Sequence, residues 1–285
     1  MHVGLRIHPC GRHTAIFYMV VRYKARDNRE PRQYAGNTKL EVAWTVVPVA
    51  IVSFLFAMSI VTARAVDGRI EREPDIVVTG HQWWWEVQCP AANATTANEI
   101  HVPLGRDMLI GVETADVIHD FWAPRLGRKV DAIPGRRNFV WIRANRIGEY
   151  FGACAEFCGA QYAGRRFRVI AQDQAAYDTW LQSQANTAAA PADNVAELGQ
   201  TRFGELTCAN CRNIRGINSQ KQYAPDLTHV ASRKMLAAEA FENTPGNLRK
   251  WLRQPGVVKP ECFMPNLNLS DSDLKALTAF LETLR

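Results

Sequence analysis

The sequence Cys154-Ala-Glu-Phe-Cys-Gly159 places two thiols four residues apart. Around it, residues 75–172 carry short runs of β-branched and aromatic residues separated by Gly and Pro, which predict strands joined by turns. Strands at this spacing are typical of a small all-β sandwich. His119 follows one of these runs, and an imidazole with two thiolates is a ligand set that suits copper. The sequence therefore predicts a β-sandwich with a metal site.

A second cysteine pair, Cys208-Ala-Asn-Cys211, lies where the apolar pattern becomes helical. A Cys-x-x-Cys pair followed directly by histidine is the attachment motif of c-type haem. The residue that follows here is Arg212, whose guanidinium stays protonated and cannot ligate iron. Met264, before a proline, offers a thioether further along the chain. The pattern indicates a haem site that has lost one ligand.

One apolar segment predicts a membrane anchor. Residues 42–63 carry no charge and are long enough to cross a hydrocarbon core of about 30 Å. Residues 14–21 form a second uncharged run that is too short to span, so the first helix of a hairpin would be truncated. Residues 22–39 hold six basic and two acidic side chains, which places them in the cytoplasm. We therefore expect the rest of the chain on the outer side of the membrane.

These signals divide the chain into four parts. We expect an N-terminal segment with the anchor over residues 1–65 and an all-β sandwich over 66–183. A linker poor in large apolar residues follows over 184–197, and residues 198–285 form a small all-α domain. The net charge of +6 is mild, and no basic stripe is interleaved with aromatic residues, so we expect no nucleic-acid partner.

Several motifs together resemble subunit II of haem–copper cytochrome c oxidases of the caa type. The ones in the sandwich are Gly80-His-Gln-Trp-Trp-Trp-Glu86, Asp116-Val-Ile-His-Asp-Phe-Trp122, Asp131-Ala-Ile-Pro-Gly135 and Cys154-Ala-Glu-Phe-Cys-Gly159. The second cysteine pair, with Lys259-Pro-Glu-Cys-Phe-Met-Pro265, resembles the cytochrome c domain fused to such subunits. The resemblance implies a cupredoxin sandwich with the binuclear CuA centre, haem c in the C-terminal domain, and electron transport in a respiratory chain.

The resemblance also implies partners and a location. Oxidase subunit I, the other oxidase subunits, cytochrome c and the membrane would be its partners. The location would be a bacterial inner (plasma) membrane, with the C-terminal domains on the periplasmic side. The oxidase is a proton-pumping oxidoreductase, but oxygen reduction belongs to subunit I. We therefore expect no catalytic residue in this chain.

The resemblance assigns copper to His119, Cys154 and Cys158, and to the backbone carbonyl of Glu156. The Glu156 carboxylate would contact a magnesium ion against subunit I. The resemblance further assigns the haem thioethers to Cys208 and Cys211 and the distal iron ligand to Met264. It assigns the surface that receives electrons to Trp83, Trp84 and Trp85.

Three positions depart from the family pattern. Tyr162 stands where the family has a second histidine, Arg165 where it has methionine, and Arg212 where it has the proximal haem histidine. We therefore expect an impaired electron relay. The alternatives are a non-redox structural or assembly subunit and a protein that binds Cu(I), or forms a disulfide, through Cys154 and Cys158. Cys89 and Cys262 are further thiols that such a disulfide could include.

Overall fold

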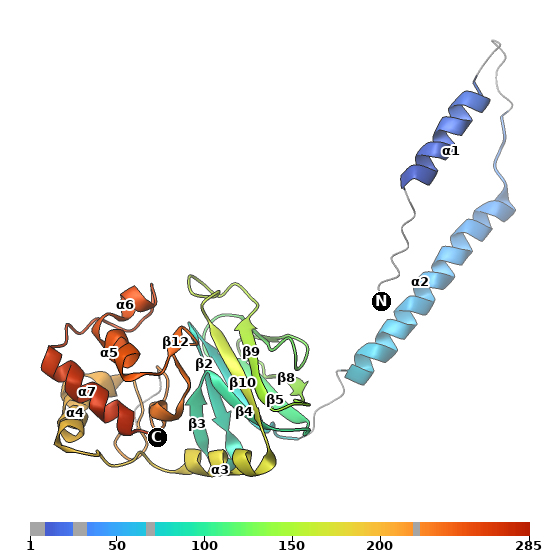
Figure 1. Ribbon diagram of the computed structural model, residues 1–285. Coiled ribbons are helices and arrows are strands. Elements are labelled where there is room, and N and C mark those ends of the chain that lie inside the picture. Colours follow the sequence, from blue (N-terminus) through green and yellow to red (C-terminus); the bar gives the residue numbers. More distant parts are fainter. Residues whose placement is uncertain (1–8, 25–32, 67–71, 219–222) are drawn as a thin grey trace. The chain divides into compact units, whose positions relative to one another are not determined.

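The computed structural model describes residues 9–24, 33–66, 72–218 and 223–285 (Figure 1). The chain divides between residues 69 and 70 into two compact units. The first unit contains the helices α1 (Pro9–Arg22) and α2 (Thr38–Val66). The second unit contains all the strands and the remaining helices.

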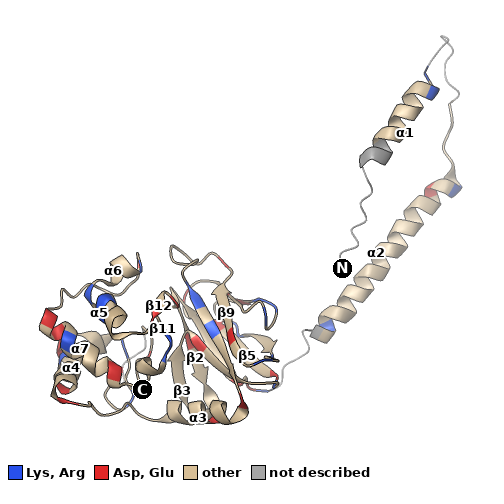
Figure 2. Ribbon diagram, viewed as in Figure 1, with Lys and Arg blue, Asp and Glu red and all other residues tan. Residues whose placement is uncertain are grey.

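Helix α2 is the predicted membrane helix. Among the described residues it alone is long and apolar enough to cross a membrane, because an 18-residue window within Thr38–Ala65 has a mean hydropathy of 2.4. Its charged residues lie only near its two ends (Figure 2), because Lys39 and Glu41 precede the apolar run and Arg64 follows it. Helix α1 has 14 residues, or about 21 Å at 1.5 Å per residue, which is less than the thickness of a hydrocarbon core.

The predicted β-sandwich is present as two five-stranded sheets, with strand orders β3-β2-β1-β5-β8 and β4-β10-β9-β6-β7. Apolar side chains from both sheets form the shared core. The strands are β1 (Ile76–His81), β2 (Trp84–Cys89), β3 (Ala94–Ala97), β4 (Glu99–Pro103), β5 (Met108–Thr114), β6 (His119–Trp122), β7 (Val130–Ala132), β8 (Asn138–Ile142), β9 (Gly148–Cys154) and β10 (Arg166–Gln172).

Aromatic side chains fill the sandwich core beneath the predicted metal site. Trp85 is fully buried, and its ring meets those of Phe121 and Phe167 edge-on at centroid distances of 5.7 Å. The short 3-10 helix η1 (Pro90–Ala92) follows β2, and helix α3 (Gln174–Ala185) closes one end of the sandwich (Figure 1). Asp173 caps α3 by accepting a hydrogen bond from the backbone N–H of Ala176.

The C-terminal region is mostly helical, as the sequence predicts. Ser270 caps its last helix by accepting a hydrogen bond from the N–H of Asp273 at 3.1 Å. The helical elements are α4 (Asn194–Glu205), η2 (Cys208–Asn210), η3 (Val230–Ser232), α5 (Pro245–Arg253), α6 (Pro255–Val258) and α7 (Asp271–Thr283). The short strands β11 (Met235–Leu236) and β12 (Phe241–Glu242) form a two-stranded ribbon.

The sandwich and the helical region share a polar interface inside the second unit. The guanidinium of Arg168 on β10 donates to both carboxylate oxygens of Glu239, at 2.9 and 3.0 Å from Nε. Glu149 on β9 pairs with both Arg168 and Lys234. Lys259 donates from Nζ to the Trp83 carbonyl at 2.9 Å. Because Arg168 and Glu239 are both buried, this ion pair is well screened from water.

The contact between α4 and α7 depends on a missing side chain. A Cβ added at Gly199 would overlap the backbone carbonyl of Ala276 and lie 2.7 Å from the Cβ of Phe280. A backbone atom cannot move aside as a flexible side chain can, so the two helices can approach this closely only at glycine.

We therefore expect Gly199→Ala to lower the stability of the full chain by about 1–3 kcal/mol, the usual cost of overpacking a core. Thermal denaturation followed by tryptophan fluorescence would measure it. Gly204→Ala is the matched control on the same helix, because a Cβ there meets nothing within 4 Å. The control should be neutral or slightly stabilising, and an equal loss in both variants would contradict the close-approach argument.

Candidate metal centre and haem-like cavity

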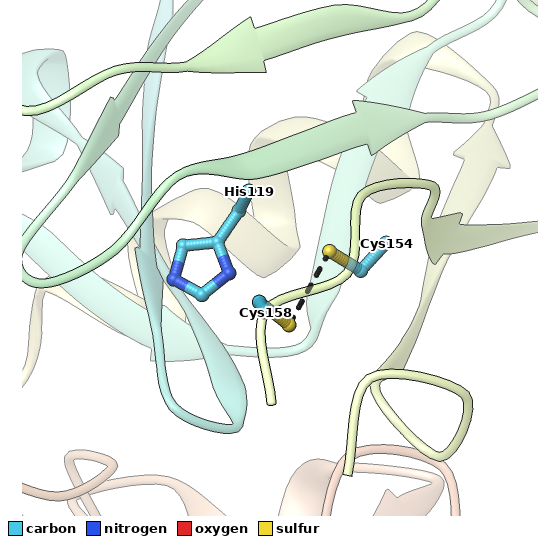
Figure 3. A group of neighbouring side chains, drawn as sticks. All are labelled: His119, Cys154 and Cys158. Atoms are coloured by element: carbon cyan, nitrogen blue, oxygen red, sulfur yellow. Dashed lines mark hydrogen bonds between the residues drawn. The ribbon is translucent and has the colours of Figure 1, made fainter. Parts of the chain in front are cut away.

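The structure brings together three of the predicted copper ligands. His119 begins β6, Cys154 ends β9, and Cys158 lies in the loop that leads to β10 (Figure 3). Strands β6 and β9 are paired, with Phe121 opposite Cys154, which carries the histidine and the first thiol to one end of the sandwich. The ligand atoms of the three buried residues all lie within 4.8 Å of one another. The two sulfur atoms are 3.8 Å apart.

Glu156 lies at the rim of this cluster. The Cys154 sulfur is 3.4 Å from the Glu156 carbonyl oxygen, so this carbonyl does face the predicted centre. The Glu156 carboxylate accepts a hydrogen bond from the N–H of Phe157 at 3.0 Å, and both residues are exposed. The magnesium contact of this carboxylate remains a prediction.

The guanidinium of Arg165 occupies the middle of the cluster. Arg165 is 0% exposed, and its Nη1 lies 3.5 Å from the Cys154 sulfur and 4.0 Å from the Cys158 sulfur. The same nitrogen donates to Nδ1 of His119. Thus one arginine contacts all three side chains that would have to bind copper.

The rest of the guanidinium is also satisfied. Its Nε and Nη2 donate to the carbonyl of Trp84 at 3.3 and 3.0 Å. Its carbon lies 3.8 Å from the centroid of the Trp85 ring, a cation–π contact. A Cβ at Gly80 on β1 would lie 2.9 Å from Nη2, so glycine is needed there for the arginine to fit.

Asp116 fixes the orientation of His119. Its carboxylate lies 2.6 Å from Nε2 of the imidazole. Because Arg165 donates to Nδ1, the proton of a neutral His119 belongs on Nε2, where it is donated to Asp116. The lone pair that a metal would need is therefore used by the arginine. Asp116 lies in one of the family-like motifs, but nothing in the sequence assigned it this role.

The two thiols differ in acidity. The hydrogen bond from Cys158 lowers the pKa of Cys154, with further help from the positive charge of Arg165. The same hydrogen bond, together with burial, raises the pKa of Cys158. The pair thus favours one thiolate that faces the guanidinium and one protonated thiol.

These residues do not fit a copper ion. The space between the three ligands is filled by a cation, and a second positive charge about 4 Å away would cost roughly 4 kcal/mol at an effective dielectric of 20. Tyr162, at the position of the family's second histidine, is 41% exposed and packs edge-on against Phe157. Tyr162 therefore gives the cluster no substitute ligand.

The tryptophan run is buried. Trp83 is 9% exposed and stacks on Phe263 of the C-terminal region at 5.0 Å, while its indole N–H donates to the Cys158 carbonyl at 3.3 Å. Trp84 is 8% exposed and stacks on His81, and Trp85 belongs to the core. The role of these residues in receiving electrons remains a prediction, but Trp83 links the copper-like cluster to the next site.

That next site is a cavity of about 390 Å³ between the helical region and the sandwich. The predicted haem-binding residues Cys208, Cys211 and Met264 line it, together with Arg212. The Nη2 of Arg212 lies 3.5 Å from the Met264 sulfur. The three predicted haem-binding residues are thus neighbours in the structure, and their role in binding haem remains a prediction.

The residues around the cavity do not provide the two axial ligands that a haem iron needs. An iron between a proximal and a distal ligand would have to lie where Arg212 contacts Met264, and a guanidinium has no lone pair to offer. His229 gives no replacement, because its ring nitrogens face the backbone carbonyls of Arg285 and Asn186 at 2.8 and 3.1 Å. The cavity and the two thiols match a haem site, but the axial ligands do not.

The six cysteines from Cys89 to Cys262, whose side chains the structure describes, are all free, so Cys89 and Cys262 pair with none of the other four. Burial raises the pKa of Cys89 to about 12.

Comparison with known protein families gives three matches, which cover successive parts of the chain. The family description "Cytochrome C oxidase subunit II, transmembrane domain" matches residues 12–61. The description "Cytochrome C oxidase subunit II, periplasmic domain" matches residues 91–171, and "Cytochrome c" matches residues 196–285.

Relatives match over most of their length. The cytochrome c oxidase subunit 2 of Alkalihalophilus pseudofirmus is 32% identical, over 95% of this chain and 81% of its own. The cytochrome c oxidase subunit 2 of Bacillus sp. (strain PS3) is 29% identical, over 93% of this chain and 79% of its own. A crystal structure of the periplasmic domain of subunit II of cytochrome oxidase from Bradyrhizobium japonicum is 29% identical, with a TM-score of 0.38 over 40% of this chain and 96% of that one.

A membrane helix, a cupredoxin-like sandwich and a cytochrome c domain on one chain define a membrane-anchored electron-transfer subunit. With the relatives above, the chain belongs to the cytochrome c oxidase subunit 2 family.

The buried contacts of Arg165 predict that it stabilises the copper-free sandwich. We expect Arg165→Met to lower the free energy of unfolding by about 3–5 kcal/mol, the usual cost of removing one partner from a buried ion pair. Denaturation of the full chain with a copper chelator present would measure it. The control is the neighbouring Arg166→Met, an exposed position that should change stability by about 0.5 kcal/mol or less. Equal stability of the two variants would rule out the stabilising role.

Proposed function

We propose that this chain serves its oxidase as a structural or assembly subunit II and that its electron relay is impaired. One observation carries the proposal. The guanidinium of Arg165 lies within hydrogen-bonding reach of His119, Cys154 and Cys158 and fills the space between them. Copper would have to displace a fully buried cation that already satisfies these three side chains.

The second relay site supports the same proposal. Arg212 takes the place of the proximal haem histidine and contacts Met264, the residue that matches the distal ligand. The maturation of c-type haem requires the histidine next to the second cysteine. Both stations of the proposed relay thus carry an arginine that contacts the remaining ligand candidates.

The parts needed for a structural role are intact. Helix α2 can anchor the chain, and the sandwich core packs around Trp85. The proposal places the chain in a bacterial inner membrane with its sandwich on the periplasmic side, bound to subunit I and the other oxidase subunits. The exposed Glu156 carboxylate is free to meet a magnesium ion at that interface. Cytochrome c would bind without passing electrons through this chain.

Metal and haem content of the full chain test this proposal. We expect the wild-type chain, expressed with copper and haem-maturation machinery, to contain neither stoichiometric copper nor covalent haem. The double variant Tyr162→His/Arg165→Met should bind copper, because it removes the cation and supplies two ligands. Arg212→His should acquire covalent haem for the corresponding reason. Elemental analysis, the visible spectrum and a haem-staining gel would measure the three chains.

Arg166→Met is the matched control, because it removes an exposed arginine next to the cluster and should leave the wild-type result unchanged. Stoichiometric copper together with covalent haem in the wild-type chain would overturn the proposal. Copper without haem in the wild-type chain would instead support the alternative of a Cu(I) protein that uses Cys154 and Cys158, whose sulfur atoms are 3.8 Å apart.

A further inference from the structure

The haem-like cavity has an unusual balance of charge. Three of its lining residues are basic, namely Arg212, Arg233 and Lys259. None of the residues that line it is aspartate or glutamate. The cavity is therefore a positively charged space in the interior of the second unit.

None of these three cations has a carboxylate as its hydrogen-bond partner among the described residues. The guanidinium of Arg212 has one such contact, to the Met264 sulfur at 3.5 Å. Arg233 donates to the carbonyl of Asp226 and to the hydroxyl of Thr96. Lys259 donates to the carbonyls of Trp83 and Ala237.

A buried charge that has no hydrogen-bonded carboxylate is costly, and its pKa responds to that cost. At Arg233 the negative charges of Asp226 and Glu99 offset part of this cost, whereas no carboxylate of the described residues does so at Arg212 or Lys259. Burial lowers the pKa of Lys259 to about 8, and burial also lowers the pKa of Arg212 and of Arg233. An anion in the cavity would offset this cost. Of the three, Arg212 keeps the most donors for it, because a guanidinium has five N–H groups and makes one side-chain contact with the residues that the structure describes.

Most of the rest of the wall is apolar. Leucines and aromatic rings from the helices α4, α5 and α7, from the ribbon and from the intervening loops surround the cavity, and they include Phe203, Leu227, Leu236, Leu248, Leu252 and Leu277. A volume of about 390 Å³ lies in the range of roughly 300–1,000 Å³ found for small-molecule sites. The matching ligand is thus apolar along most of its length and anionic at one end.

We propose that this cavity binds a single-chain amphipathic carboxylate, with its carboxylate on Arg212 and its alkyl chain along the leucine wall. Lys259 and Arg233 surround the site with further positive charge. This proposal rests on one part of the proposed function, namely that haem does not fill the cavity. It does not depend on whether copper binds at Arg165.

A haem would also be apolar and anionic, but the geometry separates the two ligands. Iron needs the space in which Arg212 contacts Met264, whereas a carboxylate needs the guanidinium itself. An alkyl chain can follow an irregular wall, and it requires no axial ligand. The arginine that excludes iron is thus the group that a carboxylate would bind.

Native mass spectrometry of the full chain, released from detergent, tests the proposal with three probes. These are oleate, oleyl alcohol and hemin, each added to the wild-type chain and to variants. We expect one oleate per wild-type chain and at least about tenfold weaker binding of oleyl alcohol, because a hydrogen bond to a charged group is lost. The alcohol matches the alkyl chain and needs no mutation, so this arm is independent of folding defects.

Arg212→Leu should weaken oleate at least about tenfold, and Arg212→Lys should retain most of the binding because it keeps the charge. Arg249→Leu is the matched control, since Arg249 lies on α5 and does not line the cavity. Denaturation midpoints would show that each variant is folded. Equal binding of oleate and oleyl alcohol, or unchanged oleate binding in Arg212→Leu, would overturn the proposal.

The hemin arm separates the two proposals. Covalent or stoichiometric hemin in the wild-type chain, with no oleate, would overturn both this proposal and the haem part of the proposed function. Failure of both oleate and hemin to bind would overturn this proposal alone.

Discussion

The side chain of Arg165 connects the two sheets of the sandwich, which share no backbone hydrogen-bond ladder. Its guanidinium reaches Trp84 on β2, His119 on β6 and Cys154 on β9, so that one side chain spans the two sheets. A metal ion bound at this place would do the same through coordination bonds. The arginine does it through directional N–H donors and a cation–π contact. Its positive charge also balances the more acidic thiol of the pair.

The copper-like cluster and the haem-like cavity each contain an arginine, but the two guanidinium groups differ in how many hydrogen-bond partners they have. Arg165 has hydrogen-bond partners for Nε, Nη1 and Nη2 and is fully buried, so its site is complete without a ligand. Arg212 has a single weak contact to a thioether and borders open space. The first site is therefore closed to a new ligand, and the second is open to one. Similar substitutions can thus have opposite consequences, depending on what surrounds the new side chain.

The strand pattern, the membrane helix and the clustering of His119, Cys154 and Cys158 were predictable, because each follows from local periodicity or from a motif. The position of the Arg165 guanidinium was not. A long flexible side chain at the metal-ligand position could equally have pointed to solvent, and tertiary contacts with the Trp84 carbonyl, the Trp85 ring and His119 hold it inside. The three cations of the cavity were also not predictable, since Arg212 and Lys259 are far apart in sequence and meet only through tertiary packing.

The buried ion pair between Arg168 and Glu239 has a consequence for how the helical region can behave. A tethered carrier domain works by leaving one docking site and reaching another. This domain is fastened to the sandwich by that pair, by Lys234 and by the stacking of Phe263 on Trp83. It therefore covers the ring of Trp83, which a freely moving domain would uncover each time it left the sandwich.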